Sequence, residues 1–215
     1  VYLYPEELVK SPKDAGIVYW GIDYSDNSKK LFIKAQNVRA PLIISNCDDL
    51  TGWSASNDAT QLTRDTIRFI QGSASIQFKI DETLSPNQRA TLKFTPSPSF
   101  DLSSYQNIGT FLVSLYMENT NGVSSVSLRW ATDASNYWVN TQTTNADGLS
   151  FQSSSWNDII FNWKDATQVG NPDSKNITFF QIDIDYNEAN FSSPQFWNID
   201  RLILNVQDRL ILTYY

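Results

Sequence analysis

The sequence predicts an all-β protein, an antiparallel β-sandwich with an N-terminal hairpin extension. Apolar and polar residues alternate with a period of two in six separate runs, and no segment keeps a helical period beyond two turns. Ser, Asn, Asp and Gly fill the stretches between the runs. A period of two places the apolar side chains of a strand on one face, and half-buried strands joined by turns are typical of antiparallel sheets. With 215 residues, of which 41% are hydrophobic, the chain is large enough to bury a core.

The hairpin extension is expected in residues 1–41, which Pro5, Pro12 and Gly16 break into short pieces. Residues 17–22 are expected to form one strand, residues 24–28 a turn, and residues 31–33 the returning strand. A two-stranded unit is marginal alone in water, so we expect it to pack on another domain or subunit.

The sandwich is expected in residues 42–206, and residues 207–215 are expected to begin a further strand or to act as a linker. The alternating runs are residues 74–80, 90–94, 111–118, 126–130, 159–163 and 180–186. Four tryptophans are in phase with apolar neighbours and are predicted to lie in the core, namely Trp53, Trp130, Trp156 and Trp163.

Composition argues against several functions. The formal net charge is −7 with no Lys/Arg cluster, which disfavours nucleic acid and anionic membranes as partners. The chain has no histidine, so the commonest general base and zinc ligand are missing. Asp183 and Asp185 have a spacing that suits a glycosidase pair, but such a pair arises easily in an acidic sheet. We therefore expect a protein that is not an enzyme.

The order of short motifs resembles that of the galactose-binding-like jelly-roll domains, which include many carbohydrate-binding modules and related domains of phage structural proteins. The motifs are Asp48–Trp53, Gln71–Phe78, Phe100–Tyr105, Val126–Trp130, Asn136–Trp138, Trp156–Phe161 and Ile199–Leu202. The resemblance covers residues 42 to about 206. It implies a jelly-roll sandwich whose first and last strands are neighbours, and it leaves the ligand open because this fold hosts many functions.

The resemblance also implies a structural calcium ion, held by an acid on the first strand and an acid on the last. The matching residues are Asp48 and Asp200, with the backbone around Gly72 as a further source of oxygen atoms. The family usually has Glu where Asp48 stands. Two alternatives stay open: Asp48 and Asp49 cap a turn, or Asp200 pairs with Arg201 or Lys79 at the surface.

A ligand-binding face is expected on the outer side of the strands. The alternation places five candidate residues opposite the core, namely Tyr116, Arg129, Gln181, Asp183 and Asp185. Tyr137 and Trp138 follow Trp130 in a polar stretch that is expected to be a loop. Aromatic faces stack on sugars, and amides, acids and Arg bind hydroxyl groups. The alternative is a solvated outer sheet in which the charges serve solubility.

Two functions follow from these observations. The one we expect is a structural module of a virion (phage tail, baseplate or capsid) or a similar assembly, in contact with other subunits and with carbohydrate. The alternative is a carbohydrate-binding module of a secreted glycan-active enzyme. The apolar chain ends, which look like cut points in a longer polypeptide, and the hairpin that needs a partner favour the assembly. Both functions place the protein in a virion or outside the cell.

Overall fold

The computed structural model describes residues 16–22, 31–38, 41–80, 88–186, 194–206 and 211–214. Backbone contacts divide the chain into two compact units, Leu42–Leu204 and Val1–Pro41 with Asn205–Tyr215. Helix in the described residues is limited to two 3₁₀ turns, η1 (Ser103–Tyr105) and η2 (Trp163–Asp165), and none of it is long and apolar enough to cross a membrane. The prediction of an all-β, antiparallel sandwich is confirmed.

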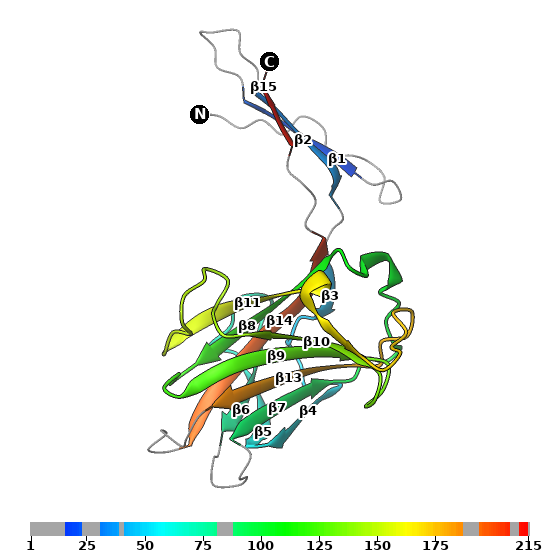
Figure 1. Cartoon of the computed structure of the whole chain (residues 1–215). Coiled ribbons are helices and arrows are strands. Elements are labelled where there is room, and N and C mark those ends of the chain that lie inside the picture. The colour runs from blue at the N-terminus through cyan, green and yellow to red at the C-terminus, as the bar shows by residue number, and fades with distance from the viewer. Residues whose placement is uncertain are drawn as a thin grey trace. The chain divides into compact units, whose positions relative to one another are not determined.

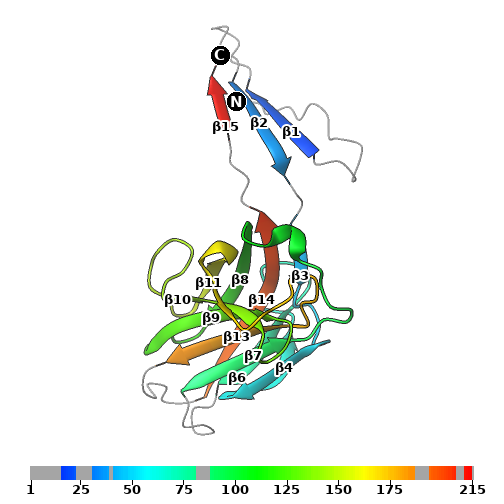
Figure 2. The ribbon, with the colours of Figure 1, turned by 45° about the vertical axis from the view of Figure 1, so that its right-hand side comes forward.

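The larger unit has two six-stranded layers (Figure 1). The first, which we call the β9 sheet, has the strand order β12-β10-β9-β13-β7-β4. Its strands are β4 (Trp53–Asn57), β7 (Arg89–Phe94), β9 (Val123–Ala131), β10 (Tyr137–Gln142), β12 (Thr167–Val169) and β13 (Phe179–Tyr186). Figure 2 shows β9, β13 and β7 running side by side.

The second layer, the β14 sheet, has the order β11-β8-β14-β6-β5, and β3 pairs with the far end of β14. Its strands are β3 (Leu42–Ser45), β5 (Ala59–Asp65), β6 (Ser75–Ile80), β8 (Gly109–Met117), β11 (Ser155–Asn162) and β14 (Gln195–Val206). Ser45 lies opposite Leu202, so the first and last strands of the sandwich are neighbours, as the sequence predicts.

The core lies between the sheets and takes the inward members of the alternating runs. Phe111, at its centre, stacks 4.7 Å from Trp130 and 5.9 Å from Trp163, measured between ring centroids. These three side chains are at most 1% exposed. Burial of such large rings contributes most of the apolar stabilisation of a sandwich.

Trp156 is not in the core, contrary to the prediction. The inward position of β11 at this point belongs to Asn157, which is fully buried. Its side-chain amide accepts the Gln152 N–H at 2.7 Å and donates to the Gln152 carbonyl at 3.0 Å. Trp156 therefore points to the outer face, where its ring lies 5.7 Å from that of Tyr116.

The smaller unit is a three-stranded antiparallel sheet of β1 (Gly16–Ile22), β2 (Leu31–Val38) and β15 (Ile211–Tyr214), in the order β1-β2-β15. The expected hairpin is present as β1 and β2, and its expected turn at residues 24–28 lies outside the described residues. The C-terminal segment joins it: Trp20 lies opposite Ile33, which lies opposite Leu212.

Candidate ligand-binding face

The outer face of the β9 sheet brings together polar side chains from three adjacent strands. Strand register sets this grouping: Gln181 lies opposite both Arg129 of β9 and Lys93 of β7. Asp185, four residues further along β13 and on the same side, lies opposite Arg89. Because directly opposed residues of paired strands point to the same side, these side chains share one surface.

Asp183 is the centre of this surface and is only 4% exposed, although it points away from the core. The Thr91 hydroxyl donates to its Oδ1 at 2.7 Å, and the Gln181 amide lies 2.9 Å from both carboxylate oxygens. The Arg129 guanidinium lies 3.8 Å away. Three neighbours therefore hold this carboxylate in one position.

Two cations on this face lie over aromatic rings. The Arg129 guanidinium carbon is 4.2 Å from the ring centroid of Tyr137, and the Lys93 ammonium is 4.0 Å from that of Phe179. Cation–π contact with the ring, together with the nearby acid, restricts Arg129 to one orientation. A donor held in this way loses little entropy when it binds a ligand.

Asp185 completes a row of polar side chains on this face, which also contains Arg129, Gln181 and Asp183. Its carboxylate accepts two hydrogen bonds from the guanidinium of Arg89, one at 3.1 Å from the terminal nitrogen and one from Nε. The Ser125 hydroxyl donates to the same carboxylate at 3.4 Å. The face thus alternates fixed donors and fixed acceptors over three strands.

Two of the predicted ligand residues lie elsewhere. Tyr116 is on β8 and points outward from the opposite sheet, where it pairs with Trp156. Trp138 is 4% exposed and packs in the core, 5.1 Å from Trp163. Tyr137 and Trp138 belong to strand β10 and not to a loop, so only Tyr137 reaches the outer face.

Four residues of this face were not among the predicted ones, namely Arg89, Thr91, Lys93 and Phe179. The alternation of β7 marks Thr91 and Lys93 as outward. Only the pairing of β7 with β13 reveals that they adjoin Asp183, and that pairing leaves no local signal in the sequence.

The two predicted calcium ligands, Asp48 and Asp200, accept hydrogen bonds from a loop. The N–H groups of Ser73 and Ala74 donate to Asp48 Oδ1 at 2.6 and 2.9 Å, and the Asn46 amide donates to Oδ2 at 2.8 Å. Asp200 is fully buried, and its Oδ2 accepts the backbone N–H of Gln71 at 2.9 Å and that of Ile70. Both acids thus anchor the β5–β6 loop.

Their environments have opposite effects on the two carboxyls. Backbone and hydroxyl donors of Ser73 hold the pKa of Asp48 below its usual value, whereas burial raises the pKa of Asp200. Asp49 caps a turn, with its Oδ1 accepting the Thr51 N–H at 2.7 Å. Arg201 pairs with Asp158 at 2.9 Å rather than with Asp200.

This donor set fits a loop anchor better than a calcium site. Calcium takes 6–8 oxygen ligands, whereas here N–H groups point at the carboxylates and Asp200 Oδ1 alone is left without a partner. Within the described residues, no three Asp, Glu, Cys or His side chains cluster as metal ligands. The calcium ion at Asp48 and Asp200 stays a prediction, and the N–H donors around both carboxylates argue against it.

Comparison with known proteins identifies the fold. No protein-family model and no curated protein matches the sequence. Solved structures do match. One is a structure from a study of carbohydrate-binding modules of the β-sandwich superfamily. It superposes on this chain with a TM-score of 0.52 at 12% sequence identity, over 88% of this chain and 86% of that chain. The fold is a β-sandwich similar to that of these modules.

Two further structures agree. The family 30 carbohydrate-binding module of a Clostridium thermocellum cellulosomal cellulase has a TM-score of 0.50 at 11% identity, over 79% of this chain and 95% of that module. An exo-β-agarase has a TM-score of 0.54 at 9% identity over 80% of this chain, which matches 25% of the agarase. At these identities the likeness concerns the fold.

Proposed function

We propose that this protein is a non-catalytic carbohydrate-binding module that holds a glycan chain on the outer face of the β9 sheet. The observation that carries the proposal is the fixed row of Arg129, Gln181, Asp183 and Asp185, with Tyr137 beside it. The fold supports the same function, since the similar structures are carbohydrate-binding modules and glycan-active enzymes.

The chemistry of the row suits hydroxyl groups. A hydroxyl both donates and accepts a hydrogen bond, so a surface that offers both on neighbouring strands binds a polyol better than it binds a simple anion or cation. Arg129 supplies donors and the partly exposed Asp185 supplies acceptors. Asp183, which is only 4% exposed, holds the Gln181 amide and Arg129 in position. The Tyr137 ring supplies an apolar surface for the C–H groups of a sugar.

The same contacts argue against hydrolysis. A glycosidase needs one carboxylic acid free to donate a proton and a second free to attack or to activate water. Asp183 is almost fully buried beneath its three partners, and Asp185 is held by Arg89. Both acids therefore serve as fixed acceptors.

The expected role as a virion module gives way to the carbohydrate-binding alternative, because the similar structures are modules and enzymes that act on glycans. In this proposal the chain is one module of an extracellular glycan-active protein. The match to one quarter of the agarase illustrates how such a sandwich is joined to a larger enzyme.

A polysaccharide array followed by titration of the best ligand tests the proposal. Arg129→Ala and Tyr137→Ala are each expected to weaken binding at least tenfold, which corresponds to about 1.4 kcal/mol. Arg201→Ala is the matched control. Like Arg129, Arg201 is ion-paired, and its side chain is 21% exposed against 24% for Arg129. It differs in lying on the opposite sheet. Binding at the β9-sheet face that survives both substitutions contradicts this site.

A further inference from the structure

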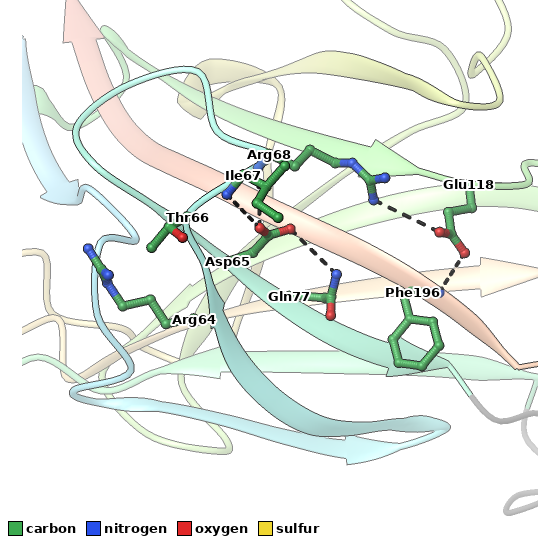
Figure 3. A pocket seen from close by; sticks show the side chains of 8 residues that line it. All are labelled: Arg64, Asp65, Thr66, Ile67, Arg68, Gln77, Glu118 and Phe196. Atoms are coloured by element: carbon green, nitrogen blue, oxygen red, sulfur yellow. Dashed lines mark hydrogen bonds and ion pairs between the residues drawn. The ribbon is translucent and has the colours of Figure 1, made fainter.

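The outer face of the β14 sheet, opposite the candidate face, carries a hollow of about 500 Å³. It lies across β5, β6, β14 and Glu118, the residue that follows β8. Figure 3 shows Arg64 at one end, Glu118 and Phe196 at the other, and Gln77 between them. Its floor is the outward side of strands whose inward side chains, such as Ile76 and Trp197, are fully buried. The hollow thus lies on the outer surface of the sheet, with residues 66–68 of the β5–β6 loop at its border.

Donors in the hollow are held in place by the protein. Arg64 donates from Nε to the Asp48 carbonyl at 2.7 Å and from a terminal nitrogen to the Ser73 hydroxyl at 2.9 Å. The Arg68 guanidinium lies 4.1 Å from the ring centroid of Tyr116 and 3.9 Å from the Glu118 carboxylate. The Arg68 guanidinium keeps further N–H groups for a ligand. Figure 3 shows the Arg64 guanidinium turned away from Gln77 and Glu118, so Arg64 borders the hollow and does not donate into it.

Acceptors lie within the same hollow. Glu118 accepts the backbone N–H of Phe196 at 2.9 Å through one oxygen, and its other oxygen faces Arg68. The Gln77 amide nitrogen lies 3.5 Å from Asp65. A phosphate or carboxylate ligand would meet Asp65 and Glu118, and a cationic ligand would meet Arg68. A hydroxyl group can accept a hydrogen bond from a guanidinium and donate one to a carboxylate, so both kinds of side chain suit it.

Apolar surface borders the polar groups. The Phe196 side chain is 41% exposed, and Ile67 on the β5–β6 loop is 93% exposed. Apolar side chains left in water gain free energy when a ligand covers them. A sugar ring offers C–H groups on its faces and hydroxyl groups on its rim, which matches an aromatic ring beside mixed donors and acceptors.

We propose that this hollow is a second saccharide site, independent of the β9 sheet. It shares its ligand class with the proposed function and none of its residues. Because the two sites lie on opposite faces of the sandwich, they bind two separate glycan chains, and the module bridges them. On a material with many chains, two sites of this kind raise the overall avidity.

Chemical-shift mapping by NMR tests each site separately. The probes are cellohexaose, neoagarohexaose and an arabinan hexasaccharide. With a sugar that binds, we expect shifts of the backbone amides of residues 64–68, 77, 118 and 196, in addition to those of the β9-sheet face. Shifts confined to the hollow support the second site and contradict the proposed function. Absence of shifts in the hollow with all three probes overturns the second site, whatever happens on the β9 sheet.

A pair of phenylalanine variants separates binding from folding. Phe196→Ala is expected to weaken binding in the hollow at least tenfold and to leave the β9-sheet shifts unchanged. Phe69→Ala is the matched control, because Phe69 is 40% exposed and does not line the hollow. Equal effects of the two substitutions on the hollow's amides overturn the assignment of Phe196 as a contact.

Discussion

Replacement of Gly72 by alanine tests the loop anchor that Asp48 provides. Gly72 lies in the β5–β6 loop with φ +77°, where L side chains are strained. A Cβ atom at this position would lie 2.4 Å from Asp48 Oδ2 and 2.5 Å from Oδ1. The substitution therefore has two costs, the strained backbone and the displacement of the carboxylate from its amide donors.

The magnitude follows from the contacts. The left-handed conformation costs an alanine about 1–2 kcal/mol. Displacement of Asp48 breaks its hydrogen bonds with the N–H groups of Ser73 and Ala74. A hydrogen bond to a charged group contributes about 1.5–3 kcal/mol to stability when it is shielded from water. At a partly exposed site such as this one, its contribution is smaller. We expect Gly72→Ala to lower the free energy of unfolding by about 3–4 kcal/mol in all.

Gly148→Ala is the matched control. Gly148 has φ +75°, and a Cβ atom there would have no heavy atom within 4 Å, so only the backbone cost of about 1–2 kcal/mol remains. Urea unfolding followed by tryptophan fluorescence measures the free energy of unfolding of both glycine variants, since Trp130, Trp163 and Trp197 are buried in the sandwich.

Equal losses in the two glycine variants would refute the anchor. A double-variant cycle sharpens the test, because in an Asp48→Ala background Gly72→Ala is expected to cost no more than Gly148→Ala. Full additivity of the Asp48 and Gly72 substitutions would show that the carboxylate and the glycine do not interact.

Three further predictions concern acid, calcium and truncation. Because the pKa of Asp48 is lowered in the folded state, its contribution to stability is present above its ordinary value of 3.8 and is lost as the pH falls through that range. Asp48→Asn is therefore expected to lose less stability than the wild type between about pH 5 and pH 3 in urea titrations. Excess EGTA is expected to leave the melting temperature unchanged, since amides already satisfy three of the four oxygen atoms of Asp48 and Asp200. A fall of several degrees would support the calcium ion and contradict this expectation. Residues 42–204 alone are expected to unfold cooperatively and to lose association with neighbouring domains or subunits, and a broad, non-cooperative transition would contradict an independent sandwich.

The sequence predicts the layers of the fold because burial sets the period of each strand. Ile76, Phe78 and Ile80 alternate with polar residues in the sequence, and they are at most 1% exposed in the structure. The same rule fails for Trp156, since a polar Asn157 takes the inward position beside it. Its carboxamide satisfies the backbone of Gln152, a partner that hydrophobicity does not indicate.

The β5–β6 loop shows a second limit. Asp200 accepts the N–H groups of Ile70 and Gln71, about 130 residues away in the sequence. A resemblance to metal-binding relatives identifies Asp48 and Asp200 as notable positions. It does not distinguish an acid that binds a cation from an acid that binds backbone amides, because both need a carboxylate at the same place.

The binding faces show a third limit, which has a physical cause. Alternation predicts which side of a strand is outward, but a sandwich has two outer faces, and only strand pairing assigns a strand to one of them. Tyr116 and Arg129 are both outward, yet they lie on opposite sheets. Within one face the grouping depends on register, since a slip of β13 by one residue would turn Asp183 toward the core and Ile182 toward solvent. The apolar side chains of β13 resist that slip, so the burial of Ile182 and Ile184 also fixes the two acids of the face that we propose binds the glycan.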